Sequence, residues 1–364
     1  MLDIYGITFD HTTNYGSCFQ AYALQKAIEG MIIENERCEY RLIPILRLSP
    51  SRKPDFVQRI KNLFYRLHRI QFRTFEDNNM KFADVNHVKE LSLLNNAADG
   101  FVCGSDVIWN PDFTGRNGAY YLDFAKKYKF SYAASFGKTE LGPEDCEWIK
   151  EHLKSFDQIS CRERSGVEIV KRCANRSAEL VVDPVLLLTE NDWNRLIEKR
   201  RSDKYIFVYI THKISGLNAF VKVLHNKTGL KVIRSAFAPG QVINQRIIQV
   251  QKPEEWLQLM RDAEYVITNS FHATAFSVLF HKKFFTFIRP GREKGINIRM
   301  NDFLEELNLG ERMVSSVPDN PDLTDIDFTV ADRRLESLRR ESLHFLQRNL
   351  ENVCRQKYNT SENG

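Results

Sequence analysis

Short apolar runs, rich in β-branched and aromatic residues, alternate along this chain with longer stretches whose apolar positions recur at helical spacing. The strand-like runs are residues 5–9, 100–103, 130–133, 158–161, 205–210, 231–234, 265–268 and 284–287. The helical patterns are residues 17–29, 143–155, 163–173, 192–199, 253–261, 271–280, 301–307 and about 331–355. Such alternation predicts an α/β fold, in which crossover helices cover parallel sheets.

The length of 364 residues indicates two domains, because a single core rarely keeps growing to this size. One strand-like run ends near Asp183, and a new α/β series begins at Tyr205. We therefore predict an N-terminal domain over residues 1–187 and a C-terminal domain over residues 188–328. Residues 329–364 are expected to form a last helix, packed back across the hinge, and a polar tail. Two domains also imply a cleft between them.

A local excess of basic side chains marks residues 41–79. Apolar residues recur at helical spacing after Pro54, which predicts an amphipathic helix with a basic face. This helix could pack on its own domain with its arginines in solvent. Alternatively, it could dock on an anionic membrane surface, where a lipid-linked acceptor would lie.

The composition is that of a globular protein, with 43% hydrophobic and 27% charged residues. The net charge of +5 suits anionic substrates without suggesting nucleic acid. No apolar run approaches the roughly 20 residues that span a bilayer, and the N-terminus lacks a signal-peptide pattern. We expect a cytoplasmic protein, associated with the inner face of the membrane if the basic helix docks there. The seven cysteines are widely spaced and contain no C-x-x-C pair, which argues against a disulfide framework and a zinc site.

The first candidate for chemistry is the turn that follows the strand-like run 265–268. Ligands collect at the carboxyl ends of parallel strands, and the helix that follows presents unpaired N–H groups and a positive dipole end to an anion. Ser270 and Thr274 add hydroxyl donors, and His272 can protonate a substrate near neutral pH. On the turn alone, Ser270 could equally be a plain helix cap and His272 a satisfied, partly buried histidine.

Two further strand ends carry candidate residues. Arg162 follows the run 158–161, where its guanidinium could hold a carboxylate or phosphate or form an ordinary ion pair. The loop after residues 100–103 combines Ser105, Asp106 and Trp109. An aromatic face and a carboxylate suit a sugar, and Asp106 could serve as a general base. The same loop could instead use Asp106 as a backbone cap and Trp109 as a cover of the core.

The first strand leads into a turn with Asn14 and Tyr15, a position that often binds ligand. The dinucleotide motif G-x-G-x-x-G is absent, and so are the signatures of P-loop enzymes, serine hydrolases and zinc proteases. These enzyme classes are therefore disfavoured.

Five blocks, read in order, resemble the polysaccharide pyruvyl transferase family. They are Asn14-Tyr15-Gly16-Ser17 with the Gln/Ala-rich residues 20–25, Gly104-Ser105-Asp106-x-x-Trp109-Asn110, Ser160-x-Arg162-Glu163, Asp183-Pro184, and Thr268-x-Ser270-Phe271-His272. The later Asn297-Ile298-Arg299 also fits the final block of the family. Single blocks are weak signals, but their shared order across nearly the whole chain is specific.

The resemblance implies a fold similar to GT-B glycosyltransferases, with two Rossmann-like domains facing across a cleft. It also implies phosphoenolpyruvate as donor, a sugar hydroxyl pair as acceptor, and a cyclic pyruvate ketal as product of surface or capsular polysaccharide biosynthesis. No metal or organic cofactor is expected. The expected catalytic residues are His272, Arg162 and Asp106. The expected donor contacts are Ser270, His272, Thr274, Arg162 and Arg299, and the expected acceptor contacts are Asn14, Tyr15, Ser105, Asp106 and Trp109.

Two other functions stay open at this point. A nucleotide-sugar glycosyltransferase would share the inferred architecture, because fold alone does not specify function. An inactive relative could serve as a scaffold in polysaccharide assembly, although the presence of His272, Arg162 and Asp106 together argues against it.

Overall fold

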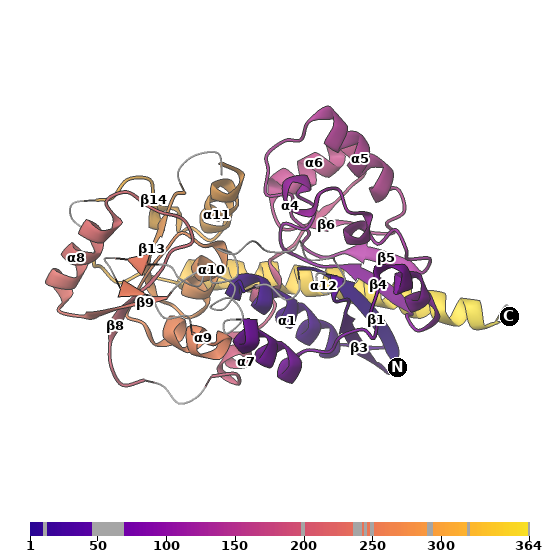
Figure 1. Cartoon of the computed structure of the whole chain (residues 1–364), viewed down its shortest axis with the longest axis horizontal. Helices are drawn as coiled ribbons and strands as arrows, with labels where there is room; N and C mark the ends of the chain where they lie inside the picture. Colours follow the sequence, from indigo (N-terminus) through magenta and orange to yellow (C-terminus); the bar gives the residue numbers. More distant parts are fainter. Residues whose placement is uncertain are drawn as a thin grey trace, which may run out of the picture.

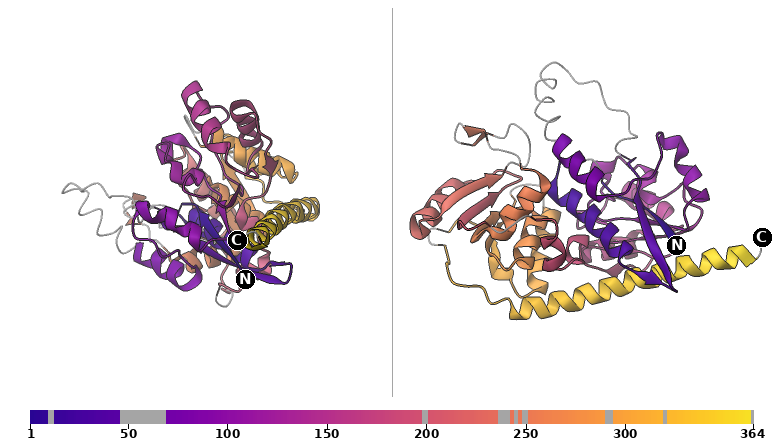
Figure 2. Two further views of the ribbon diagram at one scale, coloured as in Figure 1. Left: turned by 90° about the vertical axis from the view of Figure 1, so that its right-hand side faces the viewer. Right: turned by 90° about the horizontal axis from the view of Figure 1, so that it is seen from below.

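The computed structural model describes residues 1–9, 13–45, 69–197, 201–235, 242–243, 246–247, 251–289, 294–318 and 321–362. The chain forms two α/β halves that lie beside each other, and one long helix runs along both (Figures 1 and 2). The predicted α/β class is therefore confirmed. Most of the predicted basic segment, residues 46–68, lies outside the described residues.

The N-terminal half is built on a five-stranded sheet with the strand order β2-β3-β1-β4-β5. Its central strands are parallel, and only β2 pairs antiparallel with its neighbour. The strands are β1 (Leu2–Ile7), β2 (Ile32–Ile33), β3 (Glu36–Leu42), β4 (Gly100–Cys103) and β5 (Tyr128–Ser131), with the short pair β6 (Ser160–Cys161) and β7 (Glu179–Leu180) beyond them. The helices are α1 (Tyr15–Glu29), α4 (Pro111–Thr114), α5 (Pro143–Leu153) and α6 (Arg164–Ala174), with the 3₁₀ segments η1 (Val88–Asn96) and η2 (Gly118–Tyr121).

The C-terminal half repeats this plan with a parallel sheet in the order β14-β13-β12-β8-β9. The strands are β8 (Tyr205–Tyr209), β9 (Lys231–Ser235), β12 (Tyr265–Thr268), β13 (Lys283–Phe287) and β14 (Met313–Val314), with a separate hairpin of β10 (Val242–Ile243) and β11 (Arg246–Ile247). The helices are α8 (Leu217–Thr228), α9 (Pro253–Asp262), α10 (Phe271–Leu279) and α11 (Lys294–Glu306), and η4 (Gly310–Arg312) precedes β14. The segments η3 (Pro184–Leu186) and α7 (Glu190–Asn194) connect the halves.

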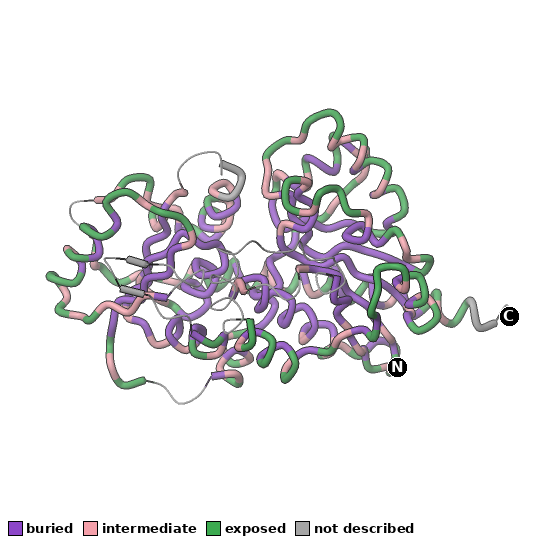
Figure 3. The backbone as a smooth tube through the Cα atoms, in the orientation of Figure 1, coloured by how far each residue is buried: buried purple, intermediate pink, exposed green. Residues whose placement is uncertain are grey.

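An aromatic cluster joins the two halves into one continuous core, and Figure 3 shows buried residues in the interior of both halves. Tyr15 of α1 stacks on Trp256 of α9 with ring centroids 4.9 Å apart, and Phe19 packs edge-on against Phe276 of α10. The hydroxyl of Tyr15 donates to the Gln251 carbonyl at 2.8 Å and accepts from the Gln251 N–H at 3.1 Å. Because aromatic side chains bury large apolar areas, this contact fixes α1 against the C-terminal half.

The last helix, α12 (Thr329–Glu362), contacts both halves. Near its start, Arg334 donates to the Glu306 carbonyl at the end of α11. Further along, the hydroxyl of Ser342 accepts from the Val182 N–H, and Asn349 accepts from the Tyr128 hydroxyl. Buried leucine and phenylalanine side chains line the inner face of α12, as its apolar spacing requires.

Several details differ from the sequence-based picture. The strand β3 was not predicted, although its alternation of charged and apolar residues has the period of a half-buried strand. Cys146 and Cys173 form a disulfide bond between α5 and α6, where none was expected. The other five cysteines are buried and free. No helix in the described part of the chain is long and apolar enough to cross a membrane.

Candidate active site

Helix starts from both halves meet at one place between the sheets. The helices α1 and α6 begin after β1 and β6 of the N-terminal half, and α10 begins directly after β12 of the C-terminal half. Parallel strands end at the same edge of a sheet, so the side chains at these turns are brought together. The buried polar side chains at this meeting point are Ser17, Asp106, Arg162, Glu163, Asp183, His272 and Arg299.

Asp183 lies at the centre of this cluster. Arg162 Nη1 donates to Asp183 Oδ2 at 2.5 Å, and His272 Nε2 lies 3.3 Å from the same oxygen. Burial alone would raise the pKa of Asp183, but the charges of His272 and Arg162 and the hydrogen bond from Arg162 hold it well below its usual range. Asp183 is therefore an ionised carboxylate that contacts Arg162 of the N-terminal half and His272 of the C-terminal half.

Asp106 forms a second carboxylate at the same site. Ser17 Oγ donates to its Oδ2 at 2.6 Å, and Arg162 Nη2 lies 3.9 Å from its Oδ1. Burial raises the pKa of Asp106, but the charges of Arg162 and His272 outweigh burial and lower it. Its backbone has a φ of 72°, an unusual conformation for a residue with a side chain. Such strain is found where a surrounding structure holds a residue in place for function.

Arg162 is enclosed by acidic groups rather than left open. Besides Asp183 and Asp106, Glu163 Oε2 lies 3.9 Å from its Nε. Glu163 itself is fixed, because its Oε1 accepts from the Ser135 hydroxyl at 2.8 Å and from the Phe136 N–H at 3.1 Å. Three carboxylates raise the pKa of Arg162 against the lowering effect of burial.

Arg299, from α11 of the C-terminal half, reaches across to the N-terminal half. Its Nη1 donates to Ser135 Oγ at 3.2 Å, and its guanidinium lies 6.0 Å from the Phe271 ring centroid. Its Nε is buried and has no hydrogen-bond partner among the described residues. Burial and the charge of Arg162 lower the pKa of Arg299 to about 10. Such a poorly compensated buried cation is suited to an anionic ligand.

The start of α10 adds further groups that favour an anion. Ser270 occupies the N-cap position, yet its side chain makes no capping hydrogen bond. The first N–H groups of α10 are therefore not satisfied by the cap, and they carry the positive end of the helix dipole. The plain helix-cap role that the sequence left open for Ser270 is not what the structure shows. Thr274 is turned inward, where its hydroxyl donates to the Ser270 carbonyl.

Exposure differs between the members of the cluster. The side chains of Asp106 and His272 are 11% and 10% exposed, whereas those of Arg162 and Asp183 are 2% and 0% exposed. Asp106 and His272 are therefore the more accessible of the four.

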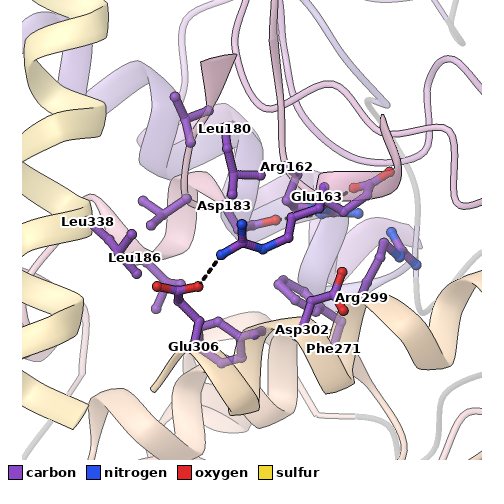
Figure 4. A pocket seen from close by; sticks show the side chains of 14 residues that line it. Arg162, Glu163, Leu180, Asp183, Leu186, Phe271, Arg299, Asp302, Glu306 and Leu338 are labelled. Atoms are coloured by element: carbon purple, nitrogen blue, oxygen red, sulfur yellow. Dashed lines mark hydrogen bonds and ion pairs between the residues drawn. The ribbon is translucent and has the colours of Figure 1, made fainter. Parts of the chain in front are cut away.

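A narrow cavity of about 70 Å³ adjoins this cluster on the side of α12 (Figure 4). Arg162, Asp183, Phe271 and Arg299 line its inner end. Arg164 of α6 crosses toward Glu306 of α11, with 2.5 Å between Nη2 and Oε2. This ion pair joins the two halves at the cavity.

Three of the remaining predicted acceptor residues are buried, and Asn14 is half-buried. Tyr15 is completely buried in the aromatic cluster between the halves, and Trp109 is completely buried with its indole stacked on Tyr121. Ser105 is also buried, with its hydroxyl 3.5 Å from Asp183 Oδ2. Asn14 caps α1 by accepting from the Gly16 N–H at 2.9 Å. Neither Tyr15 nor Trp109 offers a ring face to a sugar in this conformation.

Three residues at the site were given no role by the sequence. Asp183 was part of a recognised block, and an acidic residue before proline at a strand end was the available signal. Ser17 and Gly16 belong to the first block, yet nothing in their spacing indicates that they meet Asp106 and His272. No group of three or more His, Cys, Asp or Glu side chains able to hold a metal ion occurs within the described ranges.

Comparison with known proteins places this geometry in context. A family described as polysaccharide pyruvyl transferase matches residues 14–289, well over half of the chain. No curated protein matches the chain in sequence. Among solved structures, one assigned to UDP-N-acetylglucosamine 2-epimerase from Listeria monocytogenes has a TM-score of 0.50 at 10% identity, covering 93% of this chain and 96% of its own. The glycosyltransferase SnogD from Streptomyces nogalater has a TM-score of 0.48 at 11% identity, with 98% and 99% covered. At such low identity these likenesses concern the fold alone, which is GT-B-like with two Rossmann-like domains.

Proposed function

Because the chain belongs to the polysaccharide pyruvyl transferase family, we propose that it transfers the enolpyruvyl group of phosphoenolpyruvate to a pair of sugar hydroxyls. The product would be a cyclic pyruvate ketal on a surface or capsular polysaccharide precursor. The observation that carries this proposal is the meeting of His272, Arg162 and Arg299 with the uncapped start of α10 at one buried site.

The donor is a small molecule with a carboxylate and a phosphate, so its site needs concentrated positive charge. Arg299 has an unpartnered buried Nε, and the first turn of α10 has N–H groups that its cap leaves open. A helix start of this kind binds phosphate well. We assign the donor anion to these groups, with His272 beside it.

The chemistry requires a proton donor, an anion clamp and a base. A proton must be added to the methylene carbon of phosphoenolpyruvate, which leaves an oxocarbenium-like centre for the first hydroxyl to attack. Phosphate then leaves with the C–O bond electrons, and the second hydroxyl closes the ring. Of the two hydroxyl protons, one balances the proton added to carbon and the other departs on phosphate.

The two more accessible residues of the cluster fit these roles. His272 is the group able to supply a proton near neutral pH, and Asp106 is an ionised carboxylate able to accept one from a hydroxyl. Arg162 holds both aspartates in place rather than facing solvent. The acceptor subsite is proposed at the open side of Asp106, without Tyr15 or Trp109.

The test is incubation of the purified chain with phosphoenolpyruvate and lipid-linked or free oligosaccharides, followed by mass spectrometry. A mass gain of one pyruvyl ketal, matched by phosphate release, would support the proposal. A parallel measurement of thermal stabilisation should show a shift with phosphoenolpyruvate and none with UDP- or GDP-sugars. Stabilisation by a nucleotide sugar alone, with no ketal formed, would overturn the proposal in favour of glycosyl transfer.

A further inference from the structure

The two ring nitrogens of His272 have different surroundings. Nε2 is buried 3.3 Å from Asp183 Oδ2 in a contact that lacks hydrogen-bond alignment, and it has no hydrogen-bond partner among the described residues. Nδ1 makes no hydrogen bond within the described part of the chain, and it lies against Gly16, which has no side chain to cover it. Since Nε2 is buried, the exposed tenth of the side chain belongs to the rest of the ring.

Asp183 cannot easily turn away from His272. Its Oδ1 accepts from the Val185 N–H at 3.0 Å, and its Oδ2 accepts from Arg162 Nη1 and lies 3.5 Å from Ser105 Oγ. Burial and the charge of Asp183 raise the pKa of Tyr132, whose hydroxyl donates to the Val182 carbonyl. The carboxylate is therefore held in place by the N-terminal half and presented to a histidine of the C-terminal half.

A fixed carboxylate beside one ring nitrogen decides which nitrogen carries the proton in the neutral imidazole. We propose that Asp183 is a positioning residue that keeps a proton on His272 Nε2. Nδ1 is then the atom that exchanges protons with the substrate, a role that rests on the proposed function. Gly16 is the position whose missing side chain keeps Nδ1 reachable.

This arrangement gives a balanced proton cycle. The imidazolium donates its Nδ1 proton to the methylene carbon of phosphoenolpyruvate, and the neutral ring keeps its Nε2 proton next to Asp183. Nδ1 then accepts the proton of the attacking sugar hydroxyl as the new C–O bond forms. The imidazolium is restored, while the phosphate leaves with the electrons of the broken C–O bond.

The charges around the ring support this cycle. Asp106, Glu163 and Asp183 bring three negative charges to the cluster, and Arg162 and Arg299 bring two positive charges. A protonated imidazole makes the cluster neutral.

The direct test observes the wild-type chain and does not depend on turnover. Imidazole nitrogens of ¹⁵N-histidine-labelled protein are followed by NMR from acidic to alkaline pH, with His272→Gln to assign the signal of His272. We expect the neutral ring to carry its proton on Nε2. A neutral ring protonated on Nδ1 would overturn the proposal.

A second test measures kinetics in Asp183→Asn and Asp183→Glu. Asparagine should lower kcat at least about 100-fold and move the alkaline limb of the pH–rate profile to lower pH, because the imidazolium loses its carboxylate. Asp183→Glu should restore part of the lost kcat and part of the shift of the alkaline limb. An Asp183→Asn enzyme with an unchanged alkaline limb would contradict the proposal.

The surface pair His281 and Asp332 provides a matched control, since Nε2 and Oδ1 lie 2.8 Å apart and neither residue lines the cavity beside Arg299. Asp332→Asn should leave the pH–rate profile unchanged, and a shift as large as that of Asp183→Asn would contradict a specific role for Asp183. Failure of the proposed function would look different. The wild type would then show no turnover of phosphoenolpyruvate, whereas the NMR result would still report on the Asp183–His272 contact.

Discussion

Gly16 lies so close to His272 that a Cβ atom at position 16 would sit 2.0 Å from Nδ1 and 2.5 Å from Cγ of the imidazole. The two residues come from different halves of the molecule, and they meet where α1 and α10 begin. The ring of His272 therefore contacts the backbone of Gly16 on one side and Asp183 on the other.

The variant Gly16→Ala should displace His272 and lower kcat at least about 100-fold, because a methyl group cannot fit beside Nδ1 and acid catalysis depends on position. Phosphate release from phosphoenolpyruvate measures this. Gly142→Ala is the matched control, since nothing lies within 4 Å of a Cβ at that position. Equal activity of the two variants would show that the position of the His272 ring beside Gly16 does not affect catalysis.

Removal of the imidazole itself should have a similar result. His272→Ala is expected to lose about 100-fold or more of the rate, which is the usual contribution of a general acid. His281→Ala, at an exposed histidine on the same half, should retain full activity. Circular dichroism would establish that both variants are folded. Unchanged turnover in a folded His272→Ala protein would remove its catalytic role.

Arg299→Met should separate stability from donor binding. The buried guanidinium is poorly compensated, so its replacement should raise the free energy of unfolding of the empty protein, by on the order of 1 kcal/mol. The same change should raise the KM for phosphoenolpyruvate at least about tenfold, because a charged hydrogen bond to the donor is lost. Arg333→Met, at an exposed arginine, should change neither quantity. A less stable Arg299→Met protein with unchanged KM would contradict the assignment of this residue to the donor.

Stability at acid pH should depend on Asp106 and Asp183. The folded-state pKa of each lies below its unfolded value of about 3.9, so both stabilise the folded protein above that pH. This stabilisation is lost as the pH falls below about 4 toward the folded-state values. Urea unfolding between pH 7 and pH 3 should therefore show a falling free energy, and Asp106→Asn should give a shallower fall. A parallel fall in both proteins would argue against the ionised state of Asp106.

Tyr15→Phe should weaken the contact between the halves without touching the site. The change removes both hydrogen bonds to Gln251 and leaves a buried carbonyl and N–H unpaired, which costs about 1–3 kcal/mol. We expect a lower Tm and an unchanged KM for the acceptor. A raised acceptor KM with an unchanged Tm would instead support the acceptor role that the sequence suggested for Tyr15.

The sequence predicts much of the site because the ends of the strands can be recognised from the residue pattern. The turns at Asp106, Arg162 and His272 each follow a recognisable strand, and parallel strands bring such turns to one edge. What no local pattern reveals is the pairing across the two halves. Asp183 contacts His272 only because the C-terminal half packs against the N-terminal half, and that packing depends on the aromatic cluster.

The aromatic residues in turns show where sequence reasoning fails. Trp109 lies in the same loop as Asp106, where a ring that stacks on a sugar would be expected, yet Tyr121 covers its face. Tyr15 lies in a turn at a strand end and is completely buried between Phe72 of its own half and Trp256 of the other half. Loop position predicts proximity to the site, but only packing decides whether a ring faces solvent.

The helix α12 restricts how the enzyme can move. Its first turns are bonded to α11 and its later turns to β5 and to the segment before η3, so one rigid rod is fastened to both halves. Hinge opening that pulled the two sheets straight apart would have to break one set of these bonds or bend the rod. Admission of substrate is therefore expected to occur by twisting about the long axis of α12, a screw-like motion in which the far rim of the cleft travels furthest.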